Sequence, residues 1–391
     1  MKEINFVDML KKLWDSTGFV QSQWQNYVMI LIACVLLFVG IGLKKEPLLL
    51  VPIAFGMLLI NIPGANGILM KKPEIDPATG LTTSAGGFFY YITRGVKWVI
   101  FPPIIFLGIG AMTDFGPLIA SPKSFILGAA AQLGIFATLF GAMAIGFKGF
   151  EAAAIAIIGG ADGPTSIYVA TKMEVDNSML SAITVAAYSY MALIPIIQPP
   201  LMKLLTTKKE RSVKMEQLRK VSKREKIVFP IIITAVCGLI LPDSLPLLGM
   251  LMLGNLLKEC MVTDRLSTTA SNGLMNGITI FLGISVGSMA EGKTFLDVKT
   301  LEIVALGLVA FIMGTCGGLL MGKLLYLLSH GKVNPLIGSA GVSAVPMAAR
   351  VSQTVAQNED PNNYLLMHAM GPNVAGVIGS AVAAGVLLSI F

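Results

Sequence analysis

Apolar segments of membrane length recur along the chain and restrict it to folds that a lipid bilayer can hold. A helix needs about twenty apolar residues to cross the hydrocarbon core. Ten such segments, several of them shorter than a full crossing, lie at residues 27–43, 47–62, 97–112, 124–146, 179–202, 227–241, 245–258, 270–289, 301–328 and 364–390. Because only helices and closed barrels satisfy their backbone in lipid, we predict an all-α polytopic membrane protein with about ten transmembrane helices.

The composition agrees with this class and excludes others. Hydrophobic residues make up 54% of the chain and charged residues 13%, whereas soluble domains have about 25% charged residues. The net charge of +7 does not indicate a nucleic-acid partner, because ten Lys or Arg and only three Glu gather between Lys203 and Lys226. Loops rich in Lys and Arg stay in the cytoplasm, so we assign residues 203–226 as a basic cytoplasmic linker.

Two stretches interrupted by glycine and proline, 152–171 and 333–352, lie before the fifth segment of each half. They resemble re-entrant hairpins more than crossings. The halves also echo each other: Gly56–Leu59 returns as Gly249–Met252, and Phe106–Gly110 returns as Phe281–Ser285. We therefore divide the chain into a surface segment (1–26, predicted as an amphipathic helix), a first repeat (27–202), the linker and a second repeat (227–391).

Five crossings in each half would invert the second repeat relative to the first. Inverted repeats with discontinuous segments at the midplane are typical of transporters, and an elevator-type motion of the hairpins against a scaffold fits this plan. With the linker in the cytoplasm, both termini fall outside and the hairpins enter from opposite faces. We expect their tips to meet, with Asp162 and Ser343 close together.

The first hairpin places a carboxylate in a run of residues otherwise suited to lipid. Asp162 lies in Gly159-Gly160-Ala161-Asp162-Gly163-Pro164-Thr165. A carboxylate at membrane depth is costly unless something pairs with it, and it marks a functional site by default. The alternative is an N-cap on the second arm of the hairpin, and both roles are compatible. Thr165 adds a hydroxyl oxygen of the kind that hard cations bind, unless it bonds back along the helix.

The second hairpin carries neutral oxygen donors at the two ends of its first arm, Asn334 and Ser343. Its glycines, Gly338 and Gly341, favour close helix packing as readily as ligand binding. Arg350 follows at the cytoplasmic mouth, either as an interface anchor or as a bidentate partner for an anionic group.

The last span of each half contains one further candidate residue. Tyr188 brings a phenol hydroxyl to the middle of the segment 179–202. The run His368-Ala369-Met370-Gly371-Pro372-Asn373 is predicted to interrupt the last span where Asn373 faces the hairpin tips. His368 is read as a satisfied polar contact.

At these motifs the chain resembles the membrane beta subunits of the sodium-translocating, biotin-dependent decarboxylases. The resemblance rests on 159–165, 186–200, 221–226, 334–350 and 366–380, and it covers most of the chain from about residue 27. It implies a subunit that decarboxylates carboxybiotin and couples this to moving sodium out of the cytoplasm. The family's functional positions match Asp162, Tyr188, Asn334, Gly338, Ser343, Arg350 and Asn373.

The resemblance implies a role for each of these residues. Sodium is expected at Asp162 and Asn373, with Asn334, Ser343 and Thr165 as further ligands. Carboxybiotin is expected at Arg350, Asn334 and Gly338. Tyr188, Ser343 and Arg350 are the residues expected to take part in catalysis, with Tyr188 or Ser343 relaying a proton.

The resemblance also implies partners and a location. Biotin would be supplied by a partner, either a biotin carrier protein or a biotin carrier domain. The other expected partners are a carboxyltransferase alpha subunit, a small single-span membrane subunit of the gamma or delta type, and further beta subunits. The location would be the bacterial cytoplasmic (inner) membrane. The short stretch 63–96 favours the glutaconyl-CoA or methylmalonyl-CoA type over the oxaloacetate type. The competing class is a secondary sodium-coupled transporter, either a sodium/proton antiporter or a carboxylate symporter.

Overall fold

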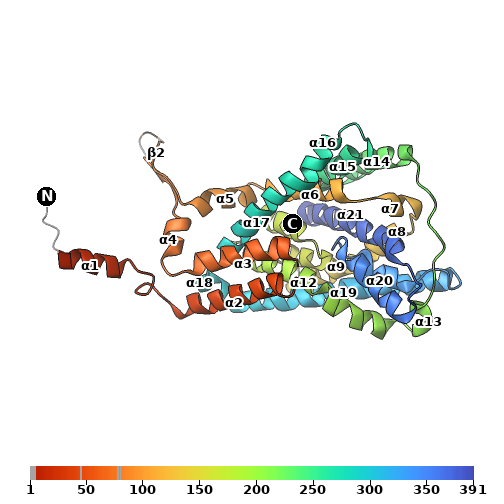
Figure 1. The fold of residues 1–391 in the computed structure, drawn as a ribbon, viewed down its shortest axis with the longest axis horizontal. Coiled ribbons are helices and arrows are strands. Elements are labelled where there is room, and N and C mark those ends of the chain that lie inside the picture. The colour runs from red at the N-terminus through yellow and green to blue at the C-terminus, as the bar shows by residue number, and fades with distance from the viewer. Residues whose placement is uncertain (1–5, 45, 77–78, 80) are drawn as a thin grey trace.

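The computed structural model describes residues 6–44, 46–76, 79 and 81–391, and these fold almost entirely into helices (Figure 1). Each of the ten predicted apolar segments falls on a helix. The surface helix predicted for residues 1–26 is seen as α1 (Phe6–Asp15), which projects from one end of the body; residues 1–5 lie outside the described part. An all-helical architecture is therefore confirmed.

The first half holds a small β-hairpin among its helices. Between α3 and α5 a small antiparallel hairpin pairs β1 (Glu74–Ile75) with β2 (Thr82–Ser84). The helices of this half are α2 (Trp24–Ile41), α3 (Pro47–Asn61), α4 (Ala65–Leu69), α5 (Phe88–Lys97), α6 (Phe101–Met112), α7 (Gly116–Ala120), α8 (Ser124–Ala131), α9 (Leu133–Ile145), α10 (Gly149–Ala156), η1 (Ile157–Gly160), α11 (Gly163–Lys172) and α12 (Asn177–Leu205).

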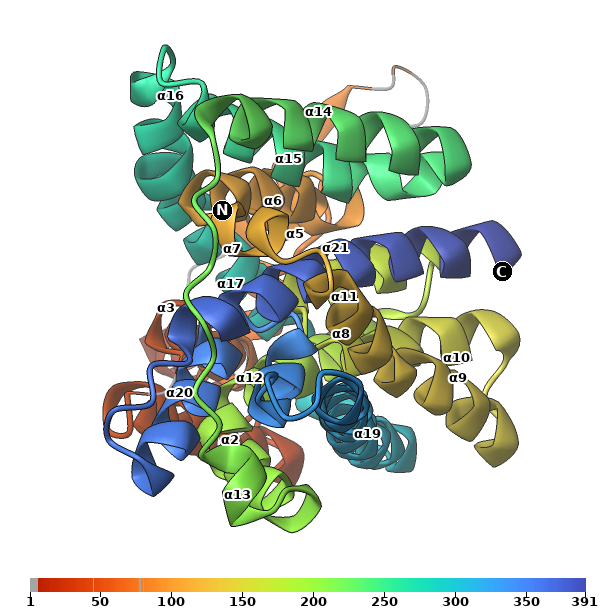
Figure 2. The same cartoon turned by 90° about the vertical axis from the view of Figure 1, so that its right-hand side faces the viewer.

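The second half follows a linker that holds one helical turn, α13 (Lys208–Arg211), and then crosses one end of the body as an extended segment (Figure 2). Its helices are α14 (Lys223–Ile240), η2 (Pro242–Ser244), α15 (Leu245–Glu259), α16 (Asp264–Thr268), η3 (Thr269–Leu274), α17 (Met275–Met289), α18 (Gly292–Phe295), α19 (Val298–Leu328), η4 (Pro335–Gly341), α20 (Met347–Glu359) and α21 (Leu366–Ile390).

Several helices are long and apolar enough to cross a membrane. Within the described residues four qualify outright: α2, the α8–α9 run, α19 and α21. Two further spans are bent, α5 with α6 by 67° and α12 by 62°. The α12 bend lies near Pro195, which cannot donate the helical hydrogen bond to Met191. These helices make the chain a membrane protein by length and composition.

One detail of the prediction is wrong. The last span is not interrupted at Met370–Pro372, because α21 runs unbroken with Pro372 inside it. Prolines are tolerated within membrane helices where neighbouring groups satisfy the freed backbone.

The helices pack in pairs that draw one member from each half. Helix α3 packs on α17 and α6 on α15; α12 packs on α19 and α8 on α21; η1 contacts α19 and η4 contacts α8. Glycines allow the closest crossings: a Cβ on Gly287 would lie 2.0 Å from the Ile53 carbonyl oxygen, and one on Gly254 would lie 2.0 Å from that of Leu107. Neither half therefore forms a separate globule.

Candidate functional site

Asp162 lies at the break of the first hairpin, where the backbone changes from η1 to α11. Ala161 adopts a left-handed conformation (φ 55°), and α11 begins at Gly163. The Asp162 carboxylate accepts a hydrogen bond from the Thr165 backbone N–H (3.4 Å), which makes it the N-cap of α11. The capping role is thus confirmed, and it uses only one carboxylate oxygen.

The other carboxylate oxygen is held by a hydroxyl. Ser380 Oγ, on α21, donates to Asp162 Oδ2 over 2.8 Å. The side chain is 4% exposed, yet none of the ion pairs within the described residues includes Asp162. A buried charge with neutral donors alone is strongly destabilising until a counter-charge neutralises it. A bound cation or a proton would neutralise this charge.

The tips of the two hairpins meet, as predicted. The Ser343 backbone N–H donates to the Gly160 carbonyl oxygen over 3.0 Å, which joins the segment after η4 to the end of η1. Ser343 and Asp162 line one cavity of about 230 Å³ together with Tyr188 of α12. Its remaining walls come from the α2–α3 turn, α3, α6, α17, the start of α20 and Val377 of α21.

Several predicted site residues carry buried oxygen atoms without a hydrogen-bond partner. Four buried atoms on predicted site residues have no hydrogen-bond partner: Thr165 Oγ1, Tyr188 Oη, Ser343 Oγ and Asn373 Oδ1. Most buried polar atoms in folded proteins are paired, so this concentration at predicted site residues requires an explanation. Oxygen donors of this kind suit a hard cation.

The charge of the site favours a monovalent ion. The described residues contain no group of three or more His, Cys, Asp or Glu that could hold a metal ion. At the hairpin tips Asp162 supplies one negative charge, and the unpaired hydroxyl and amide oxygens named above are neutral. One carboxylate with hydroxyl and amide oxygens neutralises an alkali cation and leaves a divalent ion undercompensated.

Asn373 braces the second hairpin from α21. Its Nδ2 donates to the carbonyl oxygens of Ala340 (3.0 Å), Val342 (2.8 Å) and Ala344 (3.3 Å). These carbonyls lie at the non-helical break of the hairpin. The amide therefore satisfies backbone that lipid would leave unpaired, and its own Oδ1 stays available to a ligand.

The structure does not bring Asn334 to this site. Its Nδ2 donates to the carbonyls of Arg211 and Val213, each at 2.9 Å, and its Oδ1 caps η4 by accepting from the Leu336 N–H at 3.0 Å. Asn363 donates to the same two linker carbonyls, at 3.2 and 3.1 Å. Asn334 thus ties the linker to the second hairpin, and its place among the sodium ligands stays a prediction.

Gly338 and Arg350 occupy two other environments. Gly338 is buried where η4 crosses α19, against Gly318. Arg350 is exposed on α20, one helical turn beyond Pro346, which lines the Asp162 cavity. Arg350 is thus positioned at the edge of the cavity, while Gly338 serves helix packing.

Ser380 is the contact that sequence reasoning missed. It ends the motif 366–380 and lies seven residues after Asn373, which places both on one face of a helix. That spacing was the available signal.

We expect Ser380→Ala to lower stability, because it removes a hydroxyl that donates to the buried Asp162 carboxylate over 2.8 Å. Hydrogen bonds to charged groups contribute about 1.5–3 kcal/mol. Thermal unfolding of the purified protein without sodium should show the loss, and saturating NaCl should restore part of it. An unfolding temperature equal to that of the unchanged protein would show that this bond contributes nothing.

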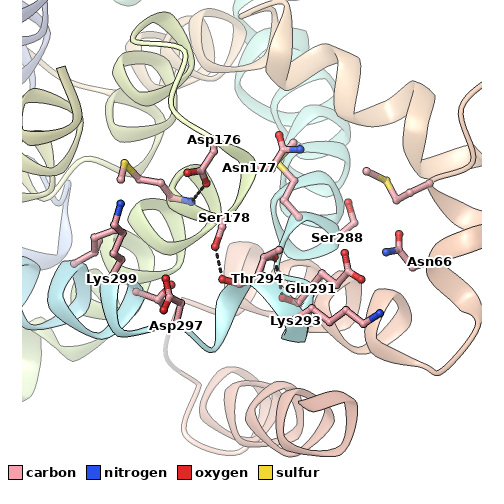
Figure 3. Close-up of a pocket in the computed structure, with 15 residues that line it drawn as sticks. Asn66, Asp176, Asn177, Ser178, Ser288, Glu291, Lys293, Thr294, Asp297 and Lys299 are labelled. Atoms are coloured by element: carbon pink, nitrogen blue, oxygen red, sulfur yellow. Dashed lines mark hydrogen bonds between the residues drawn. The ribbon is translucent and has the colours of Figure 1, made fainter. Parts of the chain in front are cut away.

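Two of the larger cavities outside this site have polar or charged linings. One, of about 470 Å³, is lined by charged residues from the start of α12, the segment after α17, α18 and the start of α19, including Asp176, Glu291, Lys293, Asp297 and Lys299 (Figure 3). Asp176 is already engaged there as the N-cap of α12, accepting from the Met179 N–H at 2.8 Å.

The other, of about 490 Å³, lies between the linker, the segment after α6, α7 and the start of α21. Its polar lining includes Asp114, Arg219, Lys226 and His368. The Lys226 ammonium pairs with Asp114 at 2.9 Å. Both cavities border the linkers and helix ends of the protein, whereas the Asp162 cavity lies at the hairpin tips.

These features define a membrane protein with a buried carboxylate, Asp162, beside a cavity at the tips of two broken hairpins. The family described as the Na⁺-transporting oxaloacetate decarboxylase beta subunit matches residues 25–391. The chain belongs to this family.

Curated relatives match over nearly their full lengths. The methylmalonyl-CoA decarboxylase subunit beta of Propionigenium modestum is 56% identical, covering 98% of this chain and all of the relative. The glutaconyl-CoA decarboxylase subunit beta of Acidaminococcus fermentans is 57% identical, covering 98% of each. The oxaloacetate decarboxylase beta chain 2 of Salmonella typhi is 48% identical, covering 98% of this chain and 99% of the relative. The resemblance read from the motifs is confirmed.

Proposed function

We propose that this chain is the membrane subunit of a decarboxylase-coupled sodium pump and that Asp162 holds the transported ion. The single observation that carries the proposal is the buried Asp162 carboxylate, which has no ion-pair partner among the described residues and shares its cavity with the unpaired Tyr188 and Ser343 hydroxyls. Family membership favours this function over a secondary sodium-coupled transporter, because all three relatives described above are decarboxylase beta subunits.

An inverted repeat is the architecture we propose for the pump. If α3, α6, α8–α9 and α12 correspond to α15, α17, α19 and α21, then exchanging the halves converts each packing pair into another observed pair. The α3–α17 pair becomes α15–α6, α12–α19 becomes α21–α8, and η1–α19 becomes η4–α8. The two large surface cavities exchange in the same way, since α17, α18 and α12 correspond to α6, α7 and α21. This regularity supports two copies of one ancestral unit.

We place the linker in the cytoplasm of a bacterial cell, because of its excess of Lys and Arg. The α2–α3 turn, the start of α17 and Arg350 then lie toward the cytoplasm. Residues from all of these regions line or border the Asp162 cavity. Sodium would therefore reach Asp162 from the cytoplasmic side. It would be attracted by the carboxylate, whose hydrogen-bond partners are neutral.

Carboxybiotin, delivered by a partner subunit, is the substrate that this mouth would receive. Its carboxylate would pair with Arg350, whose guanidinium matches the two oxygens. Breaking the bond between nitrogen and the carboxyl carbon releases CO₂ and leaves the electron pair on the biotin nitrogen, which takes a proton. Tyr188 and Ser343 present unpaired hydroxyls in the adjoining cavity and are the candidates for relaying that proton.

The partners follow from the same proposal. They are a biotin carrier protein or domain, a carboxyltransferase alpha subunit, a small single-span membrane subunit and further copies of this chain. The acyl substrate of the complex is proposed to be a CoA ester. Identity to the methylmalonyl-CoA and glutaconyl-CoA relatives is 56–57%, against 48% for the oxaloacetate relative.

Reconstitution of the purified complex tests the proposed function. Proteoliposomes supplied with the acyl substrate should take up sodium, and avidin should stop the uptake because it sequesters biotin. Two controls should show no sodium uptake. One is liposomes that lack the complex and receive the acyl substrate, and the other is proteoliposomes that hold the avidin-treated complex. Uptake that continues unchanged in avidin would identify a secondary transporter instead.

A further inference from the structure

A second carboxylate lines the same cavity as Asp162. Glu46 lies in the turn between α2 and α3, immediately before Pro47, with its backbone in a left-handed conformation (φ 42°). The motifs did not single it out. The cavity is also lined by Tyr188 and Ser343, which are 1% and 6% exposed and whose hydroxyls have no hydrogen-bond partner. The two carboxylates therefore share a cavity with two unpaired hydroxyls.

The charge of Glu46 is balanced from a distance. Burial raises the pKa of the Glu46 carboxyl, and the Arg350 guanidinium opposes this and lowers it. Within the described residues, no ion pair closer than 4.0 Å and no side-chain hydrogen bond satisfies the Glu46 carboxylate. The Glu46 carboxylate therefore interacts electrostatically with Arg350 but does not form a direct ion pair with it.

Two carboxylates in a cavity of about 230 Å³ repel each other unless a cation shares their field. Asp162 lies at the hairpin tips, and Glu46 lies on the turn beside the start of α3. Asn276 and Thr279 of α17 add neutral oxygens to the same wall. A cation that enters past the α2–α3 turn therefore meets one carboxylate before it reaches the other.

We infer that Glu46 forms an outer cation subsite, which concentrates sodium at the cavity and passes it to Asp162. Arg350 balances Glu46 while no anion is bound. When an anionic substrate group engages Arg350, the negative charge of Glu46 is no longer compensated, and the cavity attracts sodium more strongly. Substrate docking and sodium loading then favour each other, as linkage requires. This inference rests on the proposed function.

The test measures decarboxylation by the purified complex against NaCl concentration, with ionic strength held constant by choline chloride. Glu46→Gln removes the charge and keeps the shape. We expect the sodium concentration for half-maximal rate to rise roughly five- to tenfold, in line with one unit charge acting over several ångströms. The rate at saturating sodium should stay within about twofold, since Asp162 still receives the ion.

A matched control is Glu216→Gln, which removes the same charge from an exposed position on the linker. Its half-saturating sodium concentration should equal that of the unchanged protein. If Glu46→Gln fails to assemble, Glu46→Asp withdraws the carboxylate by one methylene and should raise the value roughly two- to threefold.

Each result separates this inference from the proposed function. The half-saturating sodium concentration of the Glu46 variants could equal that of the original protein while the original complex still shows avidin-sensitive uptake. That result would overturn the outer subsite alone. A complex whose turnover ignores sodium overturns the proposed function and the subsite with it. A selective rise in half-saturation for the Glu46 variants supports both.

Discussion

Replacing Asp162 with asparagine should abolish sodium-coupled turnover, lowering the sodium-dependent rate by at least about a hundredfold. Among the described residues the Asp162 carboxylate is the one negative charge on the two hairpin tips, and loss of a charge in direct contact with an ion removes several kcal/mol of attraction. Asparagine caps helices as well as aspartate does, so the Thr165 N–H should remain paired. The measurement is decarboxylation against NaCl concentration, together with sodium uptake into proteoliposomes.

This variant also separates the ion-binding role from the structural one. Because Asp162→Asn removes a buried charge that no cation pairs with, the sodium-free protein should be at least as stable as the unchanged protein. The control is Asp176→Asn, which changes another N-cap aspartate at the exposed start of α12 and should keep turnover near normal. Loss of activity with a lower unfolding temperature would assign Asp162 to capping alone.

Gly338→Ala should produce the largest loss of stability among the predicted site residues. A Cβ at this position would lie 2.0 Å from the Gly318 carbonyl oxygen, and one on Gly318 would lie 2.1 Å from that of Gly338. Both obstacles are backbone, so α19 and η4 must separate to relieve them. Overpacking of this kind costs about 1–3 kcal/mol, which thermal unfolding of the purified complex should detect.

Gly249→Ala is the matched control. Gly249 lies in α15, and a Cβ added there would have no neighbouring atom within 4 Å. It should leave stability unchanged or raise it by up to about 1 kcal/mol, since alanine favours helix. The resemblance predicts instead that Gly338 contacts carboxybiotin, and this role gives a different result for Gly338→Ala. A normal unfolding temperature with weaker use of the biotin carrier would support binding and contradict the packing role.

Much of the site could be predicted because its signals are local. Glycine and proline break a helix wherever they gather, so Gly159–Pro164 predicted both the hairpin and the cap. A charge in an apolar run is informative wherever the chain places it. The meeting of the tips then followed from counting crossings in each half, and the bond from Ser343 to Gly160 confirms it.

What the sequence could not provide are contacts between segments far apart in the chain. Asn334 faces the linker because η4 begins beside Arg211 and Val213, a proximity that no local pattern encodes. Glu46 precedes an ordinary apolar helix, and only the packing of α3 on α17 brings it to the cavity of Asp162. Pro372 gave the wrong expectation because neighbouring segments decide whether a proline breaks a buried helix.

Direct binding of radioactive sodium to the purified complex tests the central claim, that Asp162 and its surrounding oxygens hold the transported ion. The unchanged complex and the Asp162→Asn variant are compared at equal protein concentration, with potassium as the competing background ion. We predict saturable sodium binding by the unchanged complex and none above background by the folded variant. Equal saturable binding by both would contradict the assignment of Asp162 as the sodium site.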